Sequence, residues 1–308
     1  MREKIQCSKI FDVIIIGAGP AGITSAIYLA RMKLCILVIY EIIGGQTANT
    51  DGIENYTGFR IVSGGEFKKK LDEHISDYDV TLKEEKAEGI EKMKKLFKVS
   101  TGKNIYLGKA VIIASGGRRK KLKIPGEEKF GNRGVSYCSI CDAPLFRNKD
   151  VAIIGGGNTA LETALHLEKY AKKIYLITIN KEMKGQRILI EKVKDIKNVK
   201  IMPLTKTKEI KGEKFVKSII VEENGKEKEI PVQGIFIAIG HEPNSDFTNV
   251  EKNSKKEIII NEKNETSLKG IFAAGDVTNI PPKQIIISAG EGAKAALSAA
   301  EYLSESRR

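Results

Sequence analysis

Residues 13–40 read VIIIGAGPAGITSAIYLARMKLCILVIY, and this stretch decides the fold. The short apolar run Asp12–Ile16 predicts a buried strand, and Ile23–Met32 has its apolar residues at helical spacing. A glycine-rich turn, Gly17-Ala-Gly-Pro-Ala-Gly22, lies between them, and Cys35–Tyr40 predicts a second strand. The order is therefore strand, glycine turn, helix and strand, which is a βαβ unit of a parallel sheet.

The turn itself carries a chemical signal. Its glycines, Gly17, Gly19 and Gly22, have the spacing of a dinucleotide-binding turn between a strand and a helix. The first allows the tight turn, the second lets a pyrophosphate approach the backbone, and the third lets helix and strand pack closely. Glu41 ends the second strand, where an acidic residue binds a ribose hydroxyl. The pattern favours a bound dinucleotide over a chance glycine-rich turn.

Residues 151–178, VAIIGGGNTALETALHLEKYAKKIYLIT, repeat this pattern a whole domain later. Their turn, Gly155-x-Gly157-x-x-Ala160, predicts a second nucleotide site. The second strand ends in Thr178-Ile179-Asn180-Lys181, which has neither an acid for a ribose 2′-hydroxyl nor an arginine pair for a 2′-phosphate. Lys181 and Lys184 would serve a phosphate only weakly, because lysine lacks the bidentate fork of arginine. A fold unit that has lost its ligand stays the alternative.

These two units predict an α/β protein with two Rossmann-like dinucleotide-binding domains, the second inserted into the first. We expect residues 1–116 and 241–308 to form the first domain and residues 117–240 the second. The other elements that the sequence predicts are strands at Phe97–Ser100, Ile105–Leu107, Ala110–Ala114, Lys217–Glu222, Glu229–Pro231, Gly234–Ile239, Glu257–Ile260 and Gly270–Ala274, and a closing helix at Ile285–Leu303. Two short crossings, near Gly116-Gly117 and Gly240–Pro243, would permit one domain to rotate against the other.

A pair of cysteines, Cys138-Ser-Ile-Cys141, lies just before the second unit. Zinc is disfavoured because there is a single CxxC pair, and the three histidines lie far apart in the sequence. The spacing suits a redox dithiol that forms a reversible disulfide. Asp142 follows directly and is either an acid/base group for the dithiol or a helix-start cap. Cys35 is predicted to be a buried small hydrophobe.

Composition limits the remaining classes. The chain has 308 residues, 41% of them hydrophobic and 30% charged, which is typical of a soluble globular protein. Its apolar runs are too short for a membrane helix, and its start lacks the features of a secretion signal. The net charge of +13 raises the question of nucleic acid, but there is no Trp and no run of aromatic residues among the lysines. We therefore expect no nucleic-acid and no membrane partner, although a basic face would attract an acidic protein.

Together these motifs resemble the low-molecular-weight thioredoxin reductases. They resemble equally the flavoprotein subunit of alkyl hydroperoxide reductase without its N-terminal thioredoxin-like part. The resemblance covers residues 10–303. The motifs that carry it are Gly17-Ala-Gly-Pro-Ala-Gly22, Gly44-Gly45-Gln46, Glu54-Asn55-Tyr56, Tyr137-Cys138-x-x-Cys141-Asp142, Gly155-Gly-Gly-Asn-Thr-Ala160, and Ala274-Gly275-Asp276-Val277 leading to Lys283-Gln284.

The resemblance implies a set of cofactor contacts. For FAD these are Gly17, Gly19, Pro20, Ala21, Gly22, Tyr40, Glu41, Gly45, Gln46, Asn55, Ala114, Gly116, Gly275, Asp276, Lys283, Gln284 and Ile285. For NADH or NADPH they are Gly155, Gly157, Asn158, Thr159, Glu162 and Lys184. Gln46 and Asn55 would lie near the isoalloxazine, and Asp276 would hold the ribitol. Cys138, Cys141 and Asp142 would be catalytic, with Cys141 facing the flavin and Cys138 attacking the partner disulfide, and the inserted domain would rotate between two states.

The resemblance also implies the activity: a cytoplasmic, homodimeric thioredoxin-disulfide reductase without a metal, acting on a thioredoxin or glutaredoxin-like protein. One departure leaves the electron donor open between NADH, NADPH and ferredoxin. Members that use NADPH carry His-Arg-Arg and a further Arg where this chain has Thr178-Ile179-Asn180 and Lys184. Glu182-Met183-Lys184 resembles the NADH-linked hydroperoxide-reductase subunit instead. The alternatives are an NADH- or ferredoxin-linked reductase of a peroxiredoxin or glutaredoxin-like partner, a flavin-dependent dithiol oxidase, and a basic binding module without enzymatic activity.

Overall fold

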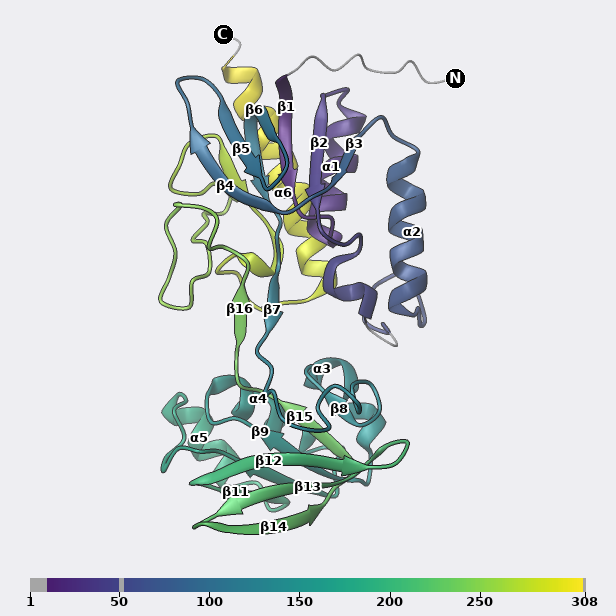
Figure 1. Cartoon of the computed structure of the whole chain (residues 1–308), viewed down its shortest axis with the longest axis vertical. Helices are drawn as coiled ribbons and strands as arrows, with labels where there is room; N and C mark the ends of the chain where they lie inside the picture. The colour runs from purple at the N-terminus through teal and green to yellow at the C-terminus, as the bar shows by residue number, and fades with distance from the viewer. Residues whose placement is uncertain (1–9, 50–52, 307–308) are drawn as a thin grey trace. The chain divides into compact units, whose positions relative to one another are not determined.

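The structure, a computed structural model, describes residues 10–49 and 53–306 (Figure 1). The chain divides into two compact units. Unit 1 is built from the residues up to Arg118 together with those from Glu242 onward, and unit 2 is Arg119–His241. The sequence places the divisions after residues 116 and 240, whereas the units divide after residues 118 and 241. Each unit contains a sheet with parallel strands at its centre and helices against it, so the α/β fold class is confirmed.

Unit 1 is organised around the long strand β6. Its sheet has the order β3-β2-β1-β6-β5-β4, and β17 also pairs with β6. The strands are β1 (Ile10–Ile16), β2 (Ile36–Tyr40), β3 (Thr81–Glu84), β4 (Ala87–Lys92), β5 (Phe97–Thr101), β6 (Ile105–Ile113) and β17 (Ile271–Ala273). The first half of β6 pairs antiparallel with β5, and its second half pairs parallel with β17. One strand thus joins the parallel βαβ core to an antiparallel hairpin.

Two sequence predictions need correction in this unit. Ile105–Leu107 and Ala110–Ala114 are predicted as separate strands, yet they form the single strand β6. The intervening Gly108 continues the strand and pairs with Phe11 of β1. A glycine suits this position because a Cβ there would lie 2.8 Å from Cγ1 of Ile14. Glu257–Ile260 is not a strand either: Ile258 makes only isolated bridges. Hydrogen bonds within and between loops fix this segment instead. A pattern of apolar residues in the sequence does not reveal such bonds.

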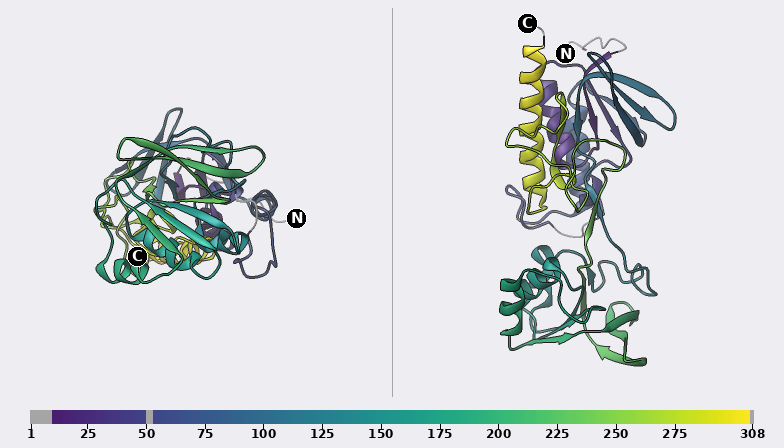
Figure 2. Two further views of the ribbon diagram at one scale, coloured as in Figure 1. Left: turned by 90° about the horizontal axis from the view of Figure 1, so that it is seen from below. Right: turned by 90° about the vertical axis from the view of Figure 1, so that its left-hand side faces the viewer.

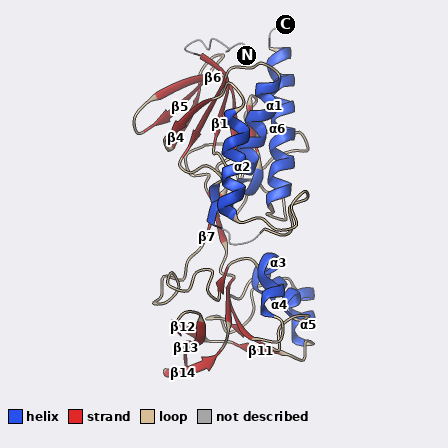
Figure 3. Cartoon of the chain, turned by 90° about the vertical axis from the view of Figure 1, so that its right-hand side faces the viewer, coloured by secondary structure: helices blue, strands red, loops and turns tan. Residues whose placement is uncertain are grey.

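The helices of unit 1 cover one face of the sheet. They are α1 (Pro20–Arg31), α2 (Gly64–Ser76) and α6 (Ile285–Glu305). Figure 2 shows α1 and α6 running side by side, and Figure 3 shows all three helices on the side opposite β4 and β5. The alternation along β1 explains the two layers, since Val13 and Ile15 join the apolar cluster of the helices while Ile14 and Ile16 join the cluster on the other face.

Unit 2 repeats the parallel arrangement and adds an antiparallel sheet. The parallel sheet has the order β11-β10-β9-β15-β8, and β12-β13-β14 form the second sheet. The strands are β8 (Val135–Ser136), β9 (Asp150–Ile154), β10 (Lys173–Ile177), β11 (Val199–Met202), β12 (Thr205–Gly212), β13 (Val216–Glu223), β14 (Lys226–Pro231) and β15 (Gly234–Ile237). The helices are α3 (Ser139–Asp142), α4 (Asn158–Leu167) and α5 (Arg187–Lys194). The chain passes between the units through β7 (Gly117–Arg119) and β16 (His241–Pro243), which pair with each other.

The structure also bears on two expectations from the sequence, the absence of a membrane helix and the burial of Cys35. Across residues 10–49 and 53–306, no helix has both the length and the apolar character to span a membrane. Cys35 is buried, with 8% of its surface exposed, but it is disulfide-bonded and so is more than a small hydrophobe.

The packing of β6 predicts a contrast within one strand. Ile112 is fully buried in the helix-facing cluster, whereas Ile105 at the other end of the strand is 63% exposed. Ile112→Ala should lower the free energy of unfolding by about 2–5 kcal/mol, because it removes buried methyl groups and leaves a cavity. Ile105→Ala, the matched control, should change it by no more than about 0.5 kcal/mol. Urea unfolding followed by circular dichroism measures both, and equal effects would contradict the assigned core.

Candidate functional site

The glycine turn between β1 and α1 combines two very tight contacts with one open position. A Cβ atom at Gly22 would lie 1.8 Å from the carbonyl oxygen of Gly17, and one at Gly17 would lie 2.2 Å from that of Ala114. Gly17 also has a φ of 110°, which favours glycine. A Cβ at Gly19, in contrast, meets no atom within 4 Å. The tight glycines fix strand against helix, and the open one leaves the backbone accessible to a phosphate at the start of α1.

The residues predicted for FAD in this unit gather at one edge of its sheet. The turn follows β1, Tyr40 and Glu41 end or follow β2, and Ala114 and Gly116 follow β6. β17 is parallel to these strands and is followed by Gly275 and Asp276. The carboxyl ends of parallel strands are where open α/β sheets bind their ligands. The sequence-predicted residues are therefore brought together by the topology.

The second turn of α6 lies close to the glycine turn. A Cβ at Gly292 would lie 2.1 Å from the carbonyl oxygen of Ala21, and the Ser25 hydroxyl donates to the Gly292 carbonyl at 2.8 Å. One turn before Gly292, the Ser288 hydroxyl donates to Oδ1 of Asp276 at 3.1 Å. The close contact of α1 and α6 thus orients Asp276, which the resemblance assigns to the ribitol. The sequence does not predict the role of Ser288, because no motif connects it with Asp276.

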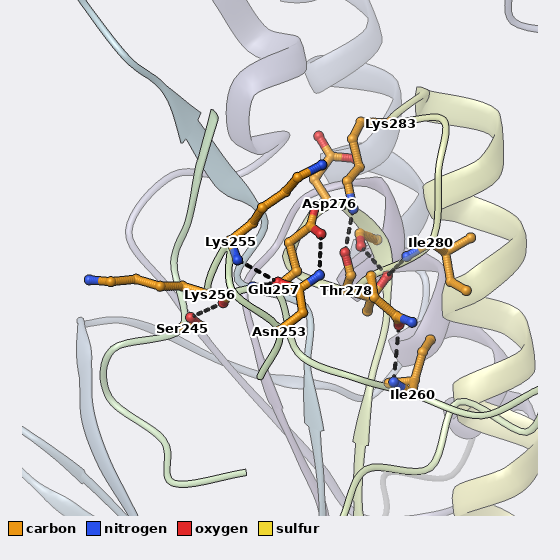
Figure 4. Close-up of polar contacts among 12 residues, drawn as sticks. Ser245, Asn253, Lys255, Lys256, Glu257, Ile260, Asp276, Thr278, Ile280 and Lys283 are labelled. Atoms are coloured by element: carbon orange, nitrogen blue, oxygen red, sulfur yellow. Dashed lines mark hydrogen bonds and ion pairs between the residues drawn. The ribbon is translucent and has the colours of Figure 1, made fainter. Parts of the chain in front are cut away.

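Two further residues assigned to the flavin meet directly. Nδ2 of Asn55 donates to Oε1 of Gln284 at 2.9 Å, although the residues are 229 positions apart in the chain. Gln284 precedes Ile285, the first residue of α6. Gln46 lies in a short 3-10 helix, Gly45–Asn49. Lys283 contacts neither Asn55 nor Gln284 through its ammonium group in these interactions. The ammonium donates to the Thr278 carbonyl and forms an ion pair with Glu257 at 3.3 Å (Figure 4).

The turn of unit 2 has the same construction. Gly155 has a φ of 147°, and a Cβ on it would lie 2.3 Å from the Ala238 carbonyl oxygen. Gly157 again faces open space, with no atom within 4 Å of an added Cβ. Gly156 is close to Thr178, because a Cβ added to Gly156 would lie 2.4 Å from Oγ1 of Thr178. The second turn therefore has the same open backbone at the start of a helix, here α4, which suits a second pyrophosphate.

A segment from the end of β10 to the start of α5 covers this second turn. The backbone N–H of Lys184 donates to the Gly156 carbonyl at 2.6 Å, and that of Gln186 donates to Oδ1 of Asn158 at 2.7 Å. The Asn158 amide oxygen is thus already used to hold the segment. Thr159 and Glu162 are exposed on α4 and free to face a ligand from solvent.

The end of β10 has no acidic side chain where the first unit has Glu41 after β2. Asn180 turns back on Thr178: its backbone N–H donates to the Thr178 hydroxyl at 3.2 Å. Ile179, beside it, is 70% exposed and has an apolar side chain that cannot bind a phosphate. No guanidinium is supplied by this strand end, so it offers no fork to a 2′-phosphate.

Cys138 and Cys141 form a disulfide at the start of α3. Sγ of Cys138 caps this helix, accepting a hydrogen bond from the backbone N–H of Cys141 at 3.2 Å. After reduction the same donor would stabilise a thiolate on Cys138, because a hydrogen bond to the charged form favours that form. The geometry therefore distinguishes the two sulfurs, because Sγ of Cys138 receives this backbone hydrogen bond.

Asp142 is linked to the dithiol through a residue that the sequence analysis missed. The Ser136 hydroxyl donates to Oδ2 of Asp142 at 2.6 Å and accepts from the backbone N–H of Cys138 at 3.1 Å. On the other side of the helix, the Ser139 hydroxyl is 3.1 Å from Nδ1 of His166 on α4. A serine two residues before a CxxC pair is the signal that would have pointed to Ser136.

The segment before the dithiol is anchored by a buried carboxylate. Glu127 is 2% exposed, and it accepts hydrogen bonds from the Tyr137 hydroxyl at 2.7 Å and from two backbone N–H groups, of Leu122 and Lys123. Burial, together with this acceptor, raises the pKa of Tyr137 above its usual value. The chain leaving β7 is thereby tied to the residue that precedes Cys138.

Metal ligands are not part of the arrangement in the described part of the chain, where no group of three or more His, Cys, Asp or Glu side chains could hold an ion. What the two glycine turns can do is bind pyrophosphates at helix starts, and what the dithiol can do is exchange a disulfide.

Comparison with known proteins agrees with this chemistry. A family model described as pyridine nucleotide-disulphide oxidoreductase matches residues 11–299. The F subunit of alkyl hydroperoxide reductase of Staphylococcus epidermidis is 42% identical over 299 residues, which is 95% of this chain and 59% of that protein. A Bacillus subtilis protein named NADH dehydrogenase is 40% identical over 95% of this chain and 58% of its own length. The chain thus spans about three fifths of the curated relatives that it matches.

The structure of a thioredoxin reductase from Streptococcus pyogenes is similar throughout. It superposes with a TM-score of 0.91 at 34% identity, covering 97% of this chain and 100% of that one. The two open glycine turns fit the cofactors of this class, FAD and a nicotinamide nucleotide. The chain belongs to the pyridine nucleotide-disulphide oxidoreductase family.

Proposed function

We propose that the chain is an FAD-dependent disulfide reductase that takes electrons from a nicotinamide nucleotide and passes them to the disulfide of a thioredoxin-like protein. The observation that carries this proposal is the Cys138–Cys141 disulfide at the start of α3, in the same unit as the open turn at Gly157. Unit 1 would bind FAD and unit 2 the nicotinamide nucleotide. Homodimer formation and a cytoplasmic location belong to the proposal and rest on the resemblance alone.

FAD, when bound, would supply two-electron transfer between the nicotinamide nucleotide and the Cys138–Cys141 disulfide. The chain's own residues then complete the exchange. The Cys138 thiolate attacks one sulfur of the partner disulfide, which releases the other as a thiolate. Cys141 attacks the Cys138 sulfur of this mixed disulfide, re-forms the internal disulfide and releases the second partner thiolate. Asp142, whose Oδ2 accepts a hydrogen bond from Ser136, would exchange the proton that Cys141 loses and the partner gains.

Exposed apolar side chains next to the dithiol support a protein as the substrate. Ile140, between the two cysteines, is 49% exposed, and Leu145, just after α3, is 63% exposed. Apolar groups at this exposure suit a protein surface better than a small charged disulfide. The partner would be thioredoxin or a glutaredoxin-like protein.

A second candidate differs in donor and partner: an NADH-linked reductase of a peroxiredoxin-type or glutaredoxin-like protein. It is favoured by Ile179 and Asn180 at the end of β10 and by the 42% identity to the alkyl hydroperoxide reductase relative. The chemistry at Cys138 and Cys141 is the same in both candidates. Turnover with purified thioredoxins and with peroxiredoxins as alternative substrates distinguishes them.

The open position at Gly19 predicts the effect of a side chain on FAD. Gly19→Val should give protein that is folded but nearly colourless, because the added methyl groups occupy the space where a pyrophosphate approaches the backbone. Gly65→Val is the matched control: Gly65 also has no atom within 4 Å of an added Cβ but lies on α2. Flavin absorbance per protein chain measures both. Full flavin content in Gly19→Val would show that the FAD site is assigned wrongly.

The capping geometry predicts distinct roles for the two cysteines. Cys138→Ser and Cys141→Ser should each abolish turnover of a protein disulfide, at least about a thousandfold, while leaving flavin reduction intact. In Cys138→Ser the remaining thiolate would face the flavin, so a long-wavelength charge-transfer absorbance is expected. Cys35→Ser, which removes a cysteine of unit 1, should keep the turnover. Retained turnover in either site variant would rule out the dithiol mechanism.

The end of β10 predicts the choice of nucleotide. A 2′-phosphate is normally held by arginine forks at about 1.5–3 kcal/mol per charge-assisted contact, so two missing contacts cost on the order of a hundredfold or more in affinity. NADH should therefore be used at least as well as NADPH. The double variant Ile179→Arg/Asn180→Arg should improve kcat/KM for NADPH preferentially. Phe215→Arg adds one positive charge to the β12–β13 turn of the same unit and should not.

Steady-state kinetics gives kcat/KM for NADH and for NADPH and so tests this prediction. A strong preference of the unmodified chain for NADPH would contradict the assignment of Ile179 and Asn180. Failure of both nucleotides would favour a ferredoxin-type donor.

A further inference from the structure

A largely buried ion pair lies on the segment that connects two parts of the proposed FAD site. Nζ of Lys283 is 3.3 Å from Oε1 of Glu257, and the two side chains are only 24% and 15% exposed. Such a pair is screened by water far less than one at the surface. Lys283 directly precedes Gln284, and Asp276 lies seven residues earlier. The pair therefore holds a segment whose two ends are both assigned to the cofactor.

The ammonium of Lys283 is held at a second point as well. It donates a hydrogen bond to the carbonyl of Thr278, a fully buried residue (Figure 4). The Thr278 hydroxyl in turn donates to the carbonyl of Gly275 at 2.8 Å. These contacts connect Lys283 to the turn that carries Asp276. The lysine side chain is thus engaged within the protein, and its charge is matched by Glu257.

Glu257 is equally well fixed. Nδ2 of Asn253 donates to its second carboxylate oxygen at 2.7 Å, and its backbone N–H donates to Oδ1 of Asn253 at 3.0 Å. The next residue, Ile258, donates its N–H to the Val277 carbonyl at 2.9 Å. Burial alone would raise the pKa of Glu257, but the Asn253 hydrogen bond and the Lys283 charge outweigh it and hold the pKa below its usual value. The carboxylate is charged, and its loop is bound to the segment it supports.

The other end of the segment reaches the proposed flavin edge. Gln284 is the N-cap residue of α6, and its Oε1 accepts a hydrogen bond from Nδ2 of Asn55 at 2.9 Å. Because Lys283 and Gln284 are adjacent in the chain, a displacement of Lys283 would also move Gln284 and disturb its hydrogen bond with Asn55. It would also change the charge close to the start of α6.

We propose that Glu257 is a positioning residue for the cofactor: it fixes Lys283, and through it Gln284 and the start of α6, and it cancels the lysine charge next to the flavin. The proposal rests on the proposed function, since it takes unit 1 as the FAD site. Its signature is a pair of opposite electrostatic effects. An unpaired ammonium would stabilise the negative charge of a reduced flavin, and an unpaired carboxylate would destabilise it.

The test measures the midpoint potential of the bound flavin and the dissociation constant for FAD in three variants. Glu257→Gln should raise the potential and Lys283→Met should lower it. Each should weaken FAD binding at least about tenfold, because one charge of a largely buried pair is left uncompensated. The double variant Glu257→Gln/Lys283→Met should return the potential close to that of the unmodified protein.

A nearby surface pair supplies the control. Lys256 and Asp246 are 3.3 Å apart, but their side chains are 63% and 71% exposed. Lys256→Met should change neither the potential nor FAD binding, since a solvated charge is screened. Shifts of the same sign in Glu257→Gln and Lys283→Met, or no shift in either, would overturn the proposal.

Two outcomes distinguish the proposed function from the role of Glu257. An unmodified protein that binds no FAD contradicts the proposed function. An unmodified protein that binds FAD, with variants that do not shift its potential in opposite directions, contradicts only the role of Glu257. If one single variant does not fold, the double variant, which leaves no unpaired charge, still tests whether the potential is restored.

Discussion

The structure of unit 1 depends on backbone contacts that leave no room for a Cβ atom. Helix α1 touches the β1 turn through Gly22, at the carbonyl of Gly17, and touches α6 through Gly292, at the carbonyl of Ala21. These contacts place the starts of two helices beside the carboxyl ends of parallel strands. Unpaired N–H groups at such helix starts attract negative charge, and Asp276 is oriented by the same α1–α6 contact through Ser288. The packing of the helices and the open backbone at the glycine turn are therefore consequences of the same small residues.

Unit 2 uses the same turn but surrounds it differently. Gly155 packs against Ala238 and Gly157 stays open, as in the first turn, yet the segment around Lys184 and Gln186 is bound across Gly156 and Asn158. The dithiol is added at the start of α3, where the backbone distinguishes its two sulfurs. Family membership shows a pyridine nucleotide-disulphide oxidoreductase. Under the proposed function, these local differences would decide which nucleotide and which partner the chain uses.

Periodicity and glycine spacing were enough to predict both βαβ units, because β1, α1 and α4 have short-range patterns that fix their conformation. They could not predict α2 or that β6 is continuous, since Gly108 looks like a break until Ile14 is placed beside it. For the site, the turns and the Cys138–Cys141 pair were visible in the sequence. Ser136 and Glu257 were not, because their roles depend on hydrogen bonds and an ion pair formed only after folding.

The central claim is that electrons from a nicotinamide nucleotide reach the dithiol through the flavin. The most direct test is an anaerobic titration of the purified holoprotein with NADH, followed by flavin absorbance and by mass spectrometry of alkylated peptides. The account predicts that the flavin bleaches and that Cys138 and Cys141 become alkylated as their disulfide is reduced. A flavin that bleaches fully and stays reduced while the Cys138–Cys141 disulfide remains intact would contradict it.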